Sequence, residues 1–207
     1  SMAGCIALDR EREALGDALH FARIQKEDTP EHQQKYYALF NTASSLGIVV
    51  QPEVHLVEKS YTELISAYCL PQRYYHVAEH IFERLGEIEK KRESKTMPLE
   101  SLLAVEFAWW HHDYIYDPRR TDNEDKSAKK AVEILTRVQA PKEFIYKVEE
   151  LIFCTKHNYP PQNSEQALLM DLDLLILGEN QDKYQGYVRK LGREYARYPL
   201  ESKISMR

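Results

Sequence analysis

The sequence predicts an all-α protein, and three features of its patterning lead to this fold class. Only seven of the 207 residues are glycine, and strong helix formers such as Leu, Ala, Glu, Lys and Arg recur throughout. Much of the chain divides into amphipathic stretches, and no segment alternates between apolar and polar residues for more than a few positions. Prolines precede several of these stretches, at the helix start where proline is best tolerated.

Nine helices are expected along the chain. Four prolines each precede an amphipathic stretch: Pro30, Pro52, Pro98 and Pro141. Gly47 and Gly178 stand where glycine would cap a helix C-terminus. The helices are predicted over residues 7–24, 30–46, 53–69, 73–92, 98–113, 123–138, 141–157, 163–177 and 181–197. The charged residues 1–28 are expected to form a helical arm, and residues 29–207 a single compact domain.

Composition narrows the function classes. With 43% hydrophobic and 29% charged residues, the chain can build a core beneath a soluble surface. Its net charge of -5 gives no indication of broad nucleic-acid binding, and no apolar run is long enough to span a membrane. Three cysteines without a pairing pattern, together with the absence of a signal peptide, predict free thiols and a cytoplasmic location. The oligomeric state stays open, and a homodimer is one of the alternatives.

The stretch over residues 102–113 leads from apolar residues into ionisable ones. Its apolar part runs directly into His111, His112 and Asp113. Ionisable groups at the end of a buried segment are costly unless they bind a metal or pair with one another. Imidazole beside carboxylate is a mixed nitrogen and oxygen ligand set that suits Mn, Fe, Co, Ni or Zn. Any further ligands must come from elsewhere in the chain.

Histidines in two other segments are candidates for these ligands. His76 and His80 are four residues apart in a predicted helix, so they would share one face and could serve one metal or two neighbouring ones. Alternatively, one of them is the hydrogen-bonded partner of a backbone or carboxylate group. His157 ends another apolar helix.

Two acids lie in the strongly apolar stretch of residues 168–177. Asp171 and Asp173 are separated by about 200° around a helix, so they cannot both face one point. One of them could cap the helix or make a surface contact. The other needs a partner, and a metal ion or a cationic histidine would provide one. Together, these polar groups on apolar helices predict a metal site.

The order of these residues resembles the HD-domain superfamily of metal-dependent phosphohydrolases, most closely a branch of small predicted phosphohydrolases. The resemblance covers roughly residues 55–180 and rests on Arg73 followed by Tyr75-His76-Val-Ala-Glu-His80, on His112-Asp113-Tyr-Ile-Tyr116-Asp117, on Asn123-Glu124-Asp-Lys-Ser127-Ala128, on Thr155-Lys-His157 and on Asp171-Leu-Asp173-Leu174. It implies a compact HD-type helical bundle. It also implies a divalent metal ion, with Mn, Mg, Fe, Co, Ni and Zn as the alternatives.

The resemblance implies a role for each matched residue. The metal would be held by four residues: His76, His112, Asp113 and Asp173. Leu172-Asp173-Leu174 fits the late ligand position of the superfamily, so Asp173 is favoured and Asp171 is the alternative. Three further residues would contact a second metal or the phosphate: His80, His157 and Lys156. His111 stands where such proteins often carry an aromatic or apolar residue, which leaves open whether it faces outward.

The same resemblance implies a mechanism. Asp113 would bind the metal and orient its water, which the metal makes a stronger nucleophile. Arg73, Lys156 and the loop pair Arg119-Arg120 are the candidates for neutralising charge on the phosphoryl oxygens. Glu124 would either act as a second base or stabilise the first turn of its helix, where acids are favoured.

We therefore expect a metal-dependent phosphohydrolase that acts on a small phosphorylated metabolite, with a nucleotide as one candidate. The alternative is a non-catalytic sensor with an HD fold that binds metal and nucleotide without turnover, and a di-iron oxygenase is a third hypothesis. The sequence has no Gly-rich phosphate loop, which counts against a nucleotide kinase or a switch GTPase.

Overall fold

The computed structural model describes residues 2–50 and 52–196, and this part of the chain is helical without any strand. Its elements are α1 (Met2–Glu27), α2 (Pro30–Ser45), α3 (Val54–Tyr68), α4 (Ala78–Ser94), α5 (Leu99–His111), α6 (Asn123–Arg137), α7 (Lys142–Cys154), α8 (Ser164–Leu174), the 3-10 helix η1 (Leu175–Gly178) and α9 (Gln181–Ala196). The all-α prediction is confirmed for these residues. The predicted end of the last helix at residue 197 lies outside them. None of the described helices combines the length and hydrophobicity needed to cross a membrane.

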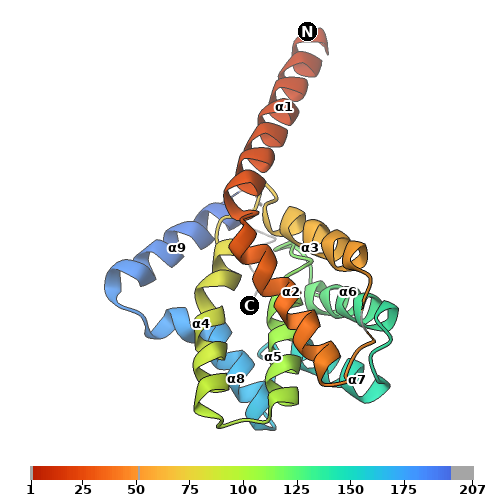
Figure 1. Ribbon diagram of the computed structural model, residues 1–207. Helices are drawn as coiled ribbons and strands as arrows, with labels where there is room; N and C mark the ends of the chain where they lie inside the picture. The colour runs from red at the N-terminus through yellow and green to blue at the C-terminus, as the bar shows by residue number, and fades with distance from the viewer. Residues whose placement is uncertain (1, 51, 197–207) are drawn as a thin grey trace.

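The N-terminal segment forms one helix, α1, that projects away from the rest of the molecule (Figure 1). Its C-terminal part is anchored to the segment after α3. There, His20 donates from Nδ1 to the carbonyl of Cys69 (2.9 Å), and Arg23 donates to the carbonyls of Leu70 (2.9 Å) and Arg73 (2.7 Å). The predicted arm is therefore a helix that docks at one end.

Free thiols were expected at all three cysteines. Cys69 and Cys154 are both free, and the first of them is buried. Cys5 lies outside the residues whose side chains the structure describes. The expectation is met at the two described positions.

Proline and glycine mark helix ends as the sequence indicates. Pro30 occupies the first turn of α2, and Pro98 and Pro141 precede the first residues of α5 and α7. Gly47 follows α2 with a positive φ of 71°, a left-handed conformation that glycine adopts without a steric penalty. These residues explain why the predicted boundaries of α2, α5 and α7 lie within a few residues of the observed ones.

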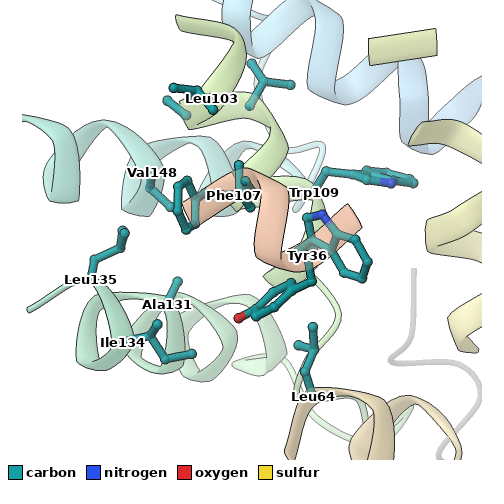
Figure 2. Close-up of a cluster of buried hydrophobic side chains, with 14 of the residues drawn as sticks. Tyr36, Leu64, Leu103, Phe107, Trp109, Ala131, Ile134, Leu135 and Val148 are labelled. Carbon is teal, nitrogen blue, oxygen red and sulfur yellow. The ribbon is translucent and has the colours of Figure 1, made fainter. Parts of the chain in front are cut away.

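The core is built around α5. Residues 101–111 of this helix are all buried, as expected for a helix that is apolar on every side. Figure 2 shows Phe107 of α5 in this core beside Val148 of α7, with Tyr36 of α2 and Leu64 of α3 nearby. Because α5 is central, its C-terminal end delivers the following polar residues into the interior of the protein.

One predicted helix starts in the wrong place. The helix predicted from residue 73 begins at Ala78, so His76 precedes α4 and does not share a helix face with His80. The backbone N–H groups of residues 74–76 donate instead to the carboxylate of Glu194 in α9, at 2.8, 2.9 and 3.3 Å. A partner 118 or more residues away thus satisfies these amides and leaves the segment non-helical.

Candidate metal centre

His112 caps the C-terminal end of α5, and one nitrogen of its ring lies close to the carboxylates of Asp113 and Asp173. Its Nδ1 donates to the carbonyl of Trp109 (2.8 Å), so in the neutral ring the lone pair lies on Nε2. That Nε2 is buried and has no hydrogen-bond partner among the described residues. It lies 3.2 Å from Oδ2 of Asp113, but without the alignment of a hydrogen bond.

Asp173 of α8 lies among three histidines. Its Oδ1 is 3.5 Å from Nε2 of His80 and 3.7 Å from Nε2 of His112, and its Oδ2 is 2.8 Å from Nε2 of His157. Nε2 of His80 is also buried without a hydrogen-bond partner in the described part of the chain. Asp173 is thus the point at which a residue of α4 and residues from the segments after α5 and α7 converge on α8.

The side chains of His80, His112 and Asp173, referred to below as the cluster, form a group with the geometry of a metal site. One potential ligand atom from each residue lies within 4.8 Å of those of the other two. Buried polar atoms without partners are rare in folded proteins, and two imidazole nitrogens directed at one carboxylate need an explanation. A metal ion would satisfy all three groups at once, so the cluster fits such an ion.

The charges of the cluster compensate one another. Burial alone would lower the pKa of His112, but the carboxylates of Asp113 and Asp173 raise it well above the usual range. Burial would raise the pKa of Asp173, yet the surrounding imidazoles of His112, His157 and His80 hold that pKa well below its usual value. A cationic imidazole therefore balances the carboxylates in this part of the interior, which is the balance that a metal ion would also provide.

His157 is held in a strained backbone conformation beside the cluster. Its φ is +53°, in the left-handed region that residues with a Cβ rarely adopt, at a typical cost of about 1–3 kcal/mol. In this conformation its Nε2 reaches Oδ2 of Asp173. His157 therefore orients the carboxylate of Asp173 and leaves the other oxygen toward the two histidines of the cluster.

His76 lies beside the cluster and not within the group defined above. Its Nδ1 is 2.5 Å from Oε1 of Glu194, and its ring stacks on that of Tyr116 at 3.8 Å. The rings of His76 and His80 are 6.4 Å apart. The structure therefore brings His80 to Asp173 and His112, where the superfamily resemblance implies His76.

Arg73 is almost completely buried and binds backbone. It donates to the carbonyls of His76 (3.3 Å), Asp113 (2.7 Å) and Tyr114 (2.8 Å). These contacts join the segment before α4 to the segment after α5. The predicted phosphate contact thus holds together the two segments that carry His76 and Asp113.

The other predicted cations are paired with acids. Nζ of Lys156 lies 2.9 and 3.0 Å from the two carboxylate oxygens of Asp125. In the loop after Pro118, Arg119 pairs with Asp117 and Arg120 pairs with Asp122, with exposed side chains in each pair. These residues stabilise the loop and the start of α6.

The two remaining predicted acids differ in environment. Glu124 is half-buried in the first turn of α6, and burial, with a contribution from the charge of Asp113, raises its pKa. Asp171 is exposed and lines a groove with Lys90 and Lys91 of α4. Asp173, and not Asp171, therefore faces the histidines.

His111 is buried, which settles the question of whether it faces outward. Its Nδ1 donates to the carbonyl of Phe107 (2.7 Å), and its Nε2 lies 3.2 Å from the hydroxyl of Tyr36. Burial lowers the pKa of His111 to about 4. His111 is therefore a neutral core residue, whereas His112, the next residue in the sequence, is part of the cluster.

A pocket of 620 Å³ opens beside His157. It is formed by α7, α8 and the segment between them, and its lining includes Phe153, Cys154, Lys156, Asn158, Tyr159 and Gln166. Two aromatic rings and three side-chain amides, those of Asn158, Gln162 and Gln166, thus line one space.

Glu194 is the buried acid that sequence reasoning missed. It belongs to a helix with many charged residues, and its sequence context does not distinguish it from the exposed acids of that helix. Tertiary packing leaves its side chain 1% exposed. Only its contacts with residues 74–76 in the folded protein identify Glu194 as a residue of this region.

No significant match to a family model, a curated protein or a solved structure is found for this chain. The side chains around Asp173 are therefore the basis for proposing a function.

Proposed function

We propose that this chain is a metal-dependent phosphohydrolase that acts on a small phosphorylated metabolite, with nucleotides as the first class to test. The observation that carries the proposal is the cluster itself. Two buried imidazole nitrogens without partners are directed at the carboxylate of Asp173, within 4.8 Å of one another. The order of the residues along the chain adds the resemblance to the HD-domain superfamily.

We assign the ion to His80, His112 and Asp173, with Asp113 beside them. Two imidazoles and a carboxylate suit Mn, Fe, Co, Ni or Zn, whereas Mg²⁺ prefers oxygen ligands and water. The Nδ1 contact of His112 with the carbonyl of Trp109 supports this assignment, because such contacts orient a histidine ligand and leave Nε2 for the ion.

The protein residues have distinct parts in the proposed reaction. A bound divalent ion would lower the pKa of a water ligand and polarise a phosphoryl oxygen. His112 and His76 hold the pKa of Asp113 below its usual range against the effect of burial, so its carboxylate is ionised and can accept a hydrogen bond from the attacking water. Glu124, with its raised pKa, is the candidate for exchanging a proton with the substrate or product.

The pocket beside His157 supports an organic substrate. Gln166 lines it and lies seven residues before Asp173 on α8, two helical turns or roughly 10 Å away on the same face. The rings of Phe153 and Tyr159 offer surfaces for stacking, and amides such as that of Asn158 offer hydrogen bonds. A heterocyclic ring in this pocket could place an attached phosphate near the cluster.

A non-catalytic sensor is the second candidate. Arg73 donates to backbone carbonyls and Lys156 is paired with Asp125, so these two of the predicted phosphate contacts are already engaged. A site with few cations for the transition state would favour binding over turnover.

Metal analysis followed by a hydrolysis screen tests the proposal. The purified protein, loaded in turn with Mn²⁺, Co²⁺, Ni²⁺ and Zn²⁺, is expected to bind a single ion per chain and to hydrolyse at least one class among phosphomonoesters and nucleotides. A wild-type protein that binds no divalent ion would remove the proposal. An ion bound tightly together with nucleotide binding and no hydrolysis would support the sensor in its place.

A further inference from the structure

Glu194 makes four contacts with the segment before α4. Its Oε2 accepts hydrogen bonds from the backbone N–H groups of Tyr74 (2.8 Å), Tyr75 (2.9 Å) and His76 (3.3 Å). Its Oε1 lies 2.5 Å from Nδ1 of the His76 ring. A single carboxylate from α9 therefore holds both the backbone and the side chain of His76.

This arrangement determines which nitrogen of His76 carries hydrogen. Three backbone N–H groups donate to Oε2 of Glu194, and hydrogen bonds of this kind favour the ionised form of a carboxylate. An ionised carboxylate only accepts hydrogen bonds, so Nδ1 of His76 must be the donor. In the neutral ring, Nε2 then carries the lone pair and is the nitrogen left to bind another group.

His76 lies close enough to the cluster for that nitrogen to matter. The centroid of its ring is 6.4 Å from that of His80, a member of the cluster. The ring is held from one side by Tyr116, whose hydroxyl lies 3.2 Å from that of Tyr195 in α9. Helix α9 thus supports His76 both through Glu194 and through Tyr116.

We propose that Glu194 is a positioning residue of the metal site and that it acts through His76. By accepting the Nδ1–H of His76, it leaves Nε2 as a donor for the ion assigned to His80, His112 and Asp173. The inference rests on the proposed function. A carboxylate behind a histidine ligand is a recurring arrangement in metal proteins, where it sets the orientation and the basicity of the ring.

The substitution Glu194→Gln separates this role from simple anchoring. Glutamine keeps the size of the side chain and one oxygen, which can still accept the backbone N–H groups of residues 74–76. Its NH₂ group would then face Nδ1 of His76 and force the hydrogen of the ring onto Nε2. We expect the affinity for Mn²⁺ or Zn²⁺, measured by competition with a chelating dye, to fall ten- to a hundredfold.

Two further variants show whether Glu194→Gln lowers the metal affinity through His76. Lys190→Gln removes an ion pair of α9 with Glu79 (2.9 Å) on the surface and should leave the metal affinity unchanged. In a His76→Ala background, Glu194→Gln should produce no further loss, because the residue through which it acts is gone. An equal loss in both backgrounds would show that Glu194 acts through the fold and would overturn the inference.

An NMR measurement on the metal-free protein completes the test. At a pH high enough for the ring to be neutral, the nitrogen chemical shifts of His76 in the wild-type protein should show hydrogen on Nδ1 and a lone pair on Nε2. The opposite tautomer would overturn the inference even if the Glu194→Gln variant failed to fold. A wild type that binds ions, with an unchanged affinity in Glu194→Gln, would remove only this inference. A wild type that binds no ion would remove the proposed function and, with it, this role of Glu194.

Discussion

His111 and His112 are consecutive residues, yet they lie in two different regions of the interior. On the side of α2 and α3, both ring nitrogens of His111 have partners, the carbonyl of Phe107 and the hydroxyl of Tyr36. The same hydroxyl lies 3.2 Å from that of Ser60. On the side of α4 and α8, Nε2 of His112 has no hydrogen-bond partner among the described residues and faces carboxylates.

The contrast between these regions separates a structural histidine from a candidate metal ligand. Both rings are buried, so burial does not separate them. The His111 ring is satisfied and has a lowered pKa, whereas the His112 ring is unsatisfied and carboxylates raise its pKa. A complete set of neutral partners indicates a core residue, and an open nitrogen among charges indicates a binding site.

The largest expected effect is on the cluster side of this comparison. Asp173→Asn removes the charge that attracts the ion, and we expect the metal affinity to fall by more than the roughly hundredfold loss typical of residues that act behind a ligand. Asp171→Asn, on the exposed face of α8, is the matched control and should bind metal as the wild type does. A larger loss for Asp171→Asn than for Asp173→Asn, in a dye competition assay, would contradict the assignment.

The next effect is the dependence of stability on pH, and it concerns His111 on the core side. His111 has a pKa of about 4 in the folded protein, against about 6.5 in the unfolded chain. The unfolded state therefore binds more protons between these values, and the free energy of unfolding falls as the pH decreases from 6.5 toward 4. The contribution of this ring amounts to about 3 kcal/mol across the whole window.

Urea unfolding of the metal-free protein at several pH values between 7 and 5 measures this dependence. The variant His111→Gln has no ring to protonate, so its stability should depend less steeply on pH than that of the wild type. Parallel pH profiles for the two proteins would show that His111 does not titrate as its surroundings indicate.

The smallest expected effect is a loss of stability on the core side, where Tyr36 contacts His111. Tyr36→Phe removes the hydroxyl that contacts His111 and Ser60, and it leaves a buried nitrogen without its partner. We expect a loss of about 1–3 kcal/mol in the free energy of unfolding and no change in metal affinity. A change in metal affinity would show that the two sides of α5 are coupled.

Several features of the site could be predicted from sequence because they depend on local order. His112 and Asp113 follow an apolar helix directly, so their placement in the interior follows from the burial of α5. Helical phase indicated only that Asp171 and Asp173 face different sides. The choice of Asp173 came from the resemblance to the superfamily, and the structure places Asp173 beside the histidines. Whether these residues bind an ion stays a prediction.

Other features could not be predicted because they depend on distant partners. The assignment of His76 to a helix face shared with His80 assumed that residues 73–77 are helical. Local sequence patterns carry no information about a contact with Glu194, which lies 118 residues after His76. Nor does the sequence order distinguish His111, which meets Tyr36 across the core, from an exposed residue.

The all-α class, most helix boundaries and the segments that carry the ionisable residues could be predicted from the amino-acid sequence. Periodicity, proline and glycine act through neighbouring backbone groups, so these properties are readable over short stretches of chain. Which nitrogen of each histidine is left open, and which acid contacts the other nitrogen, depends on tertiary packing. Those outcomes depend on hydrogen bonds such as that between Glu194 and His76, which form only after α9 has docked and removed the carboxylate from water.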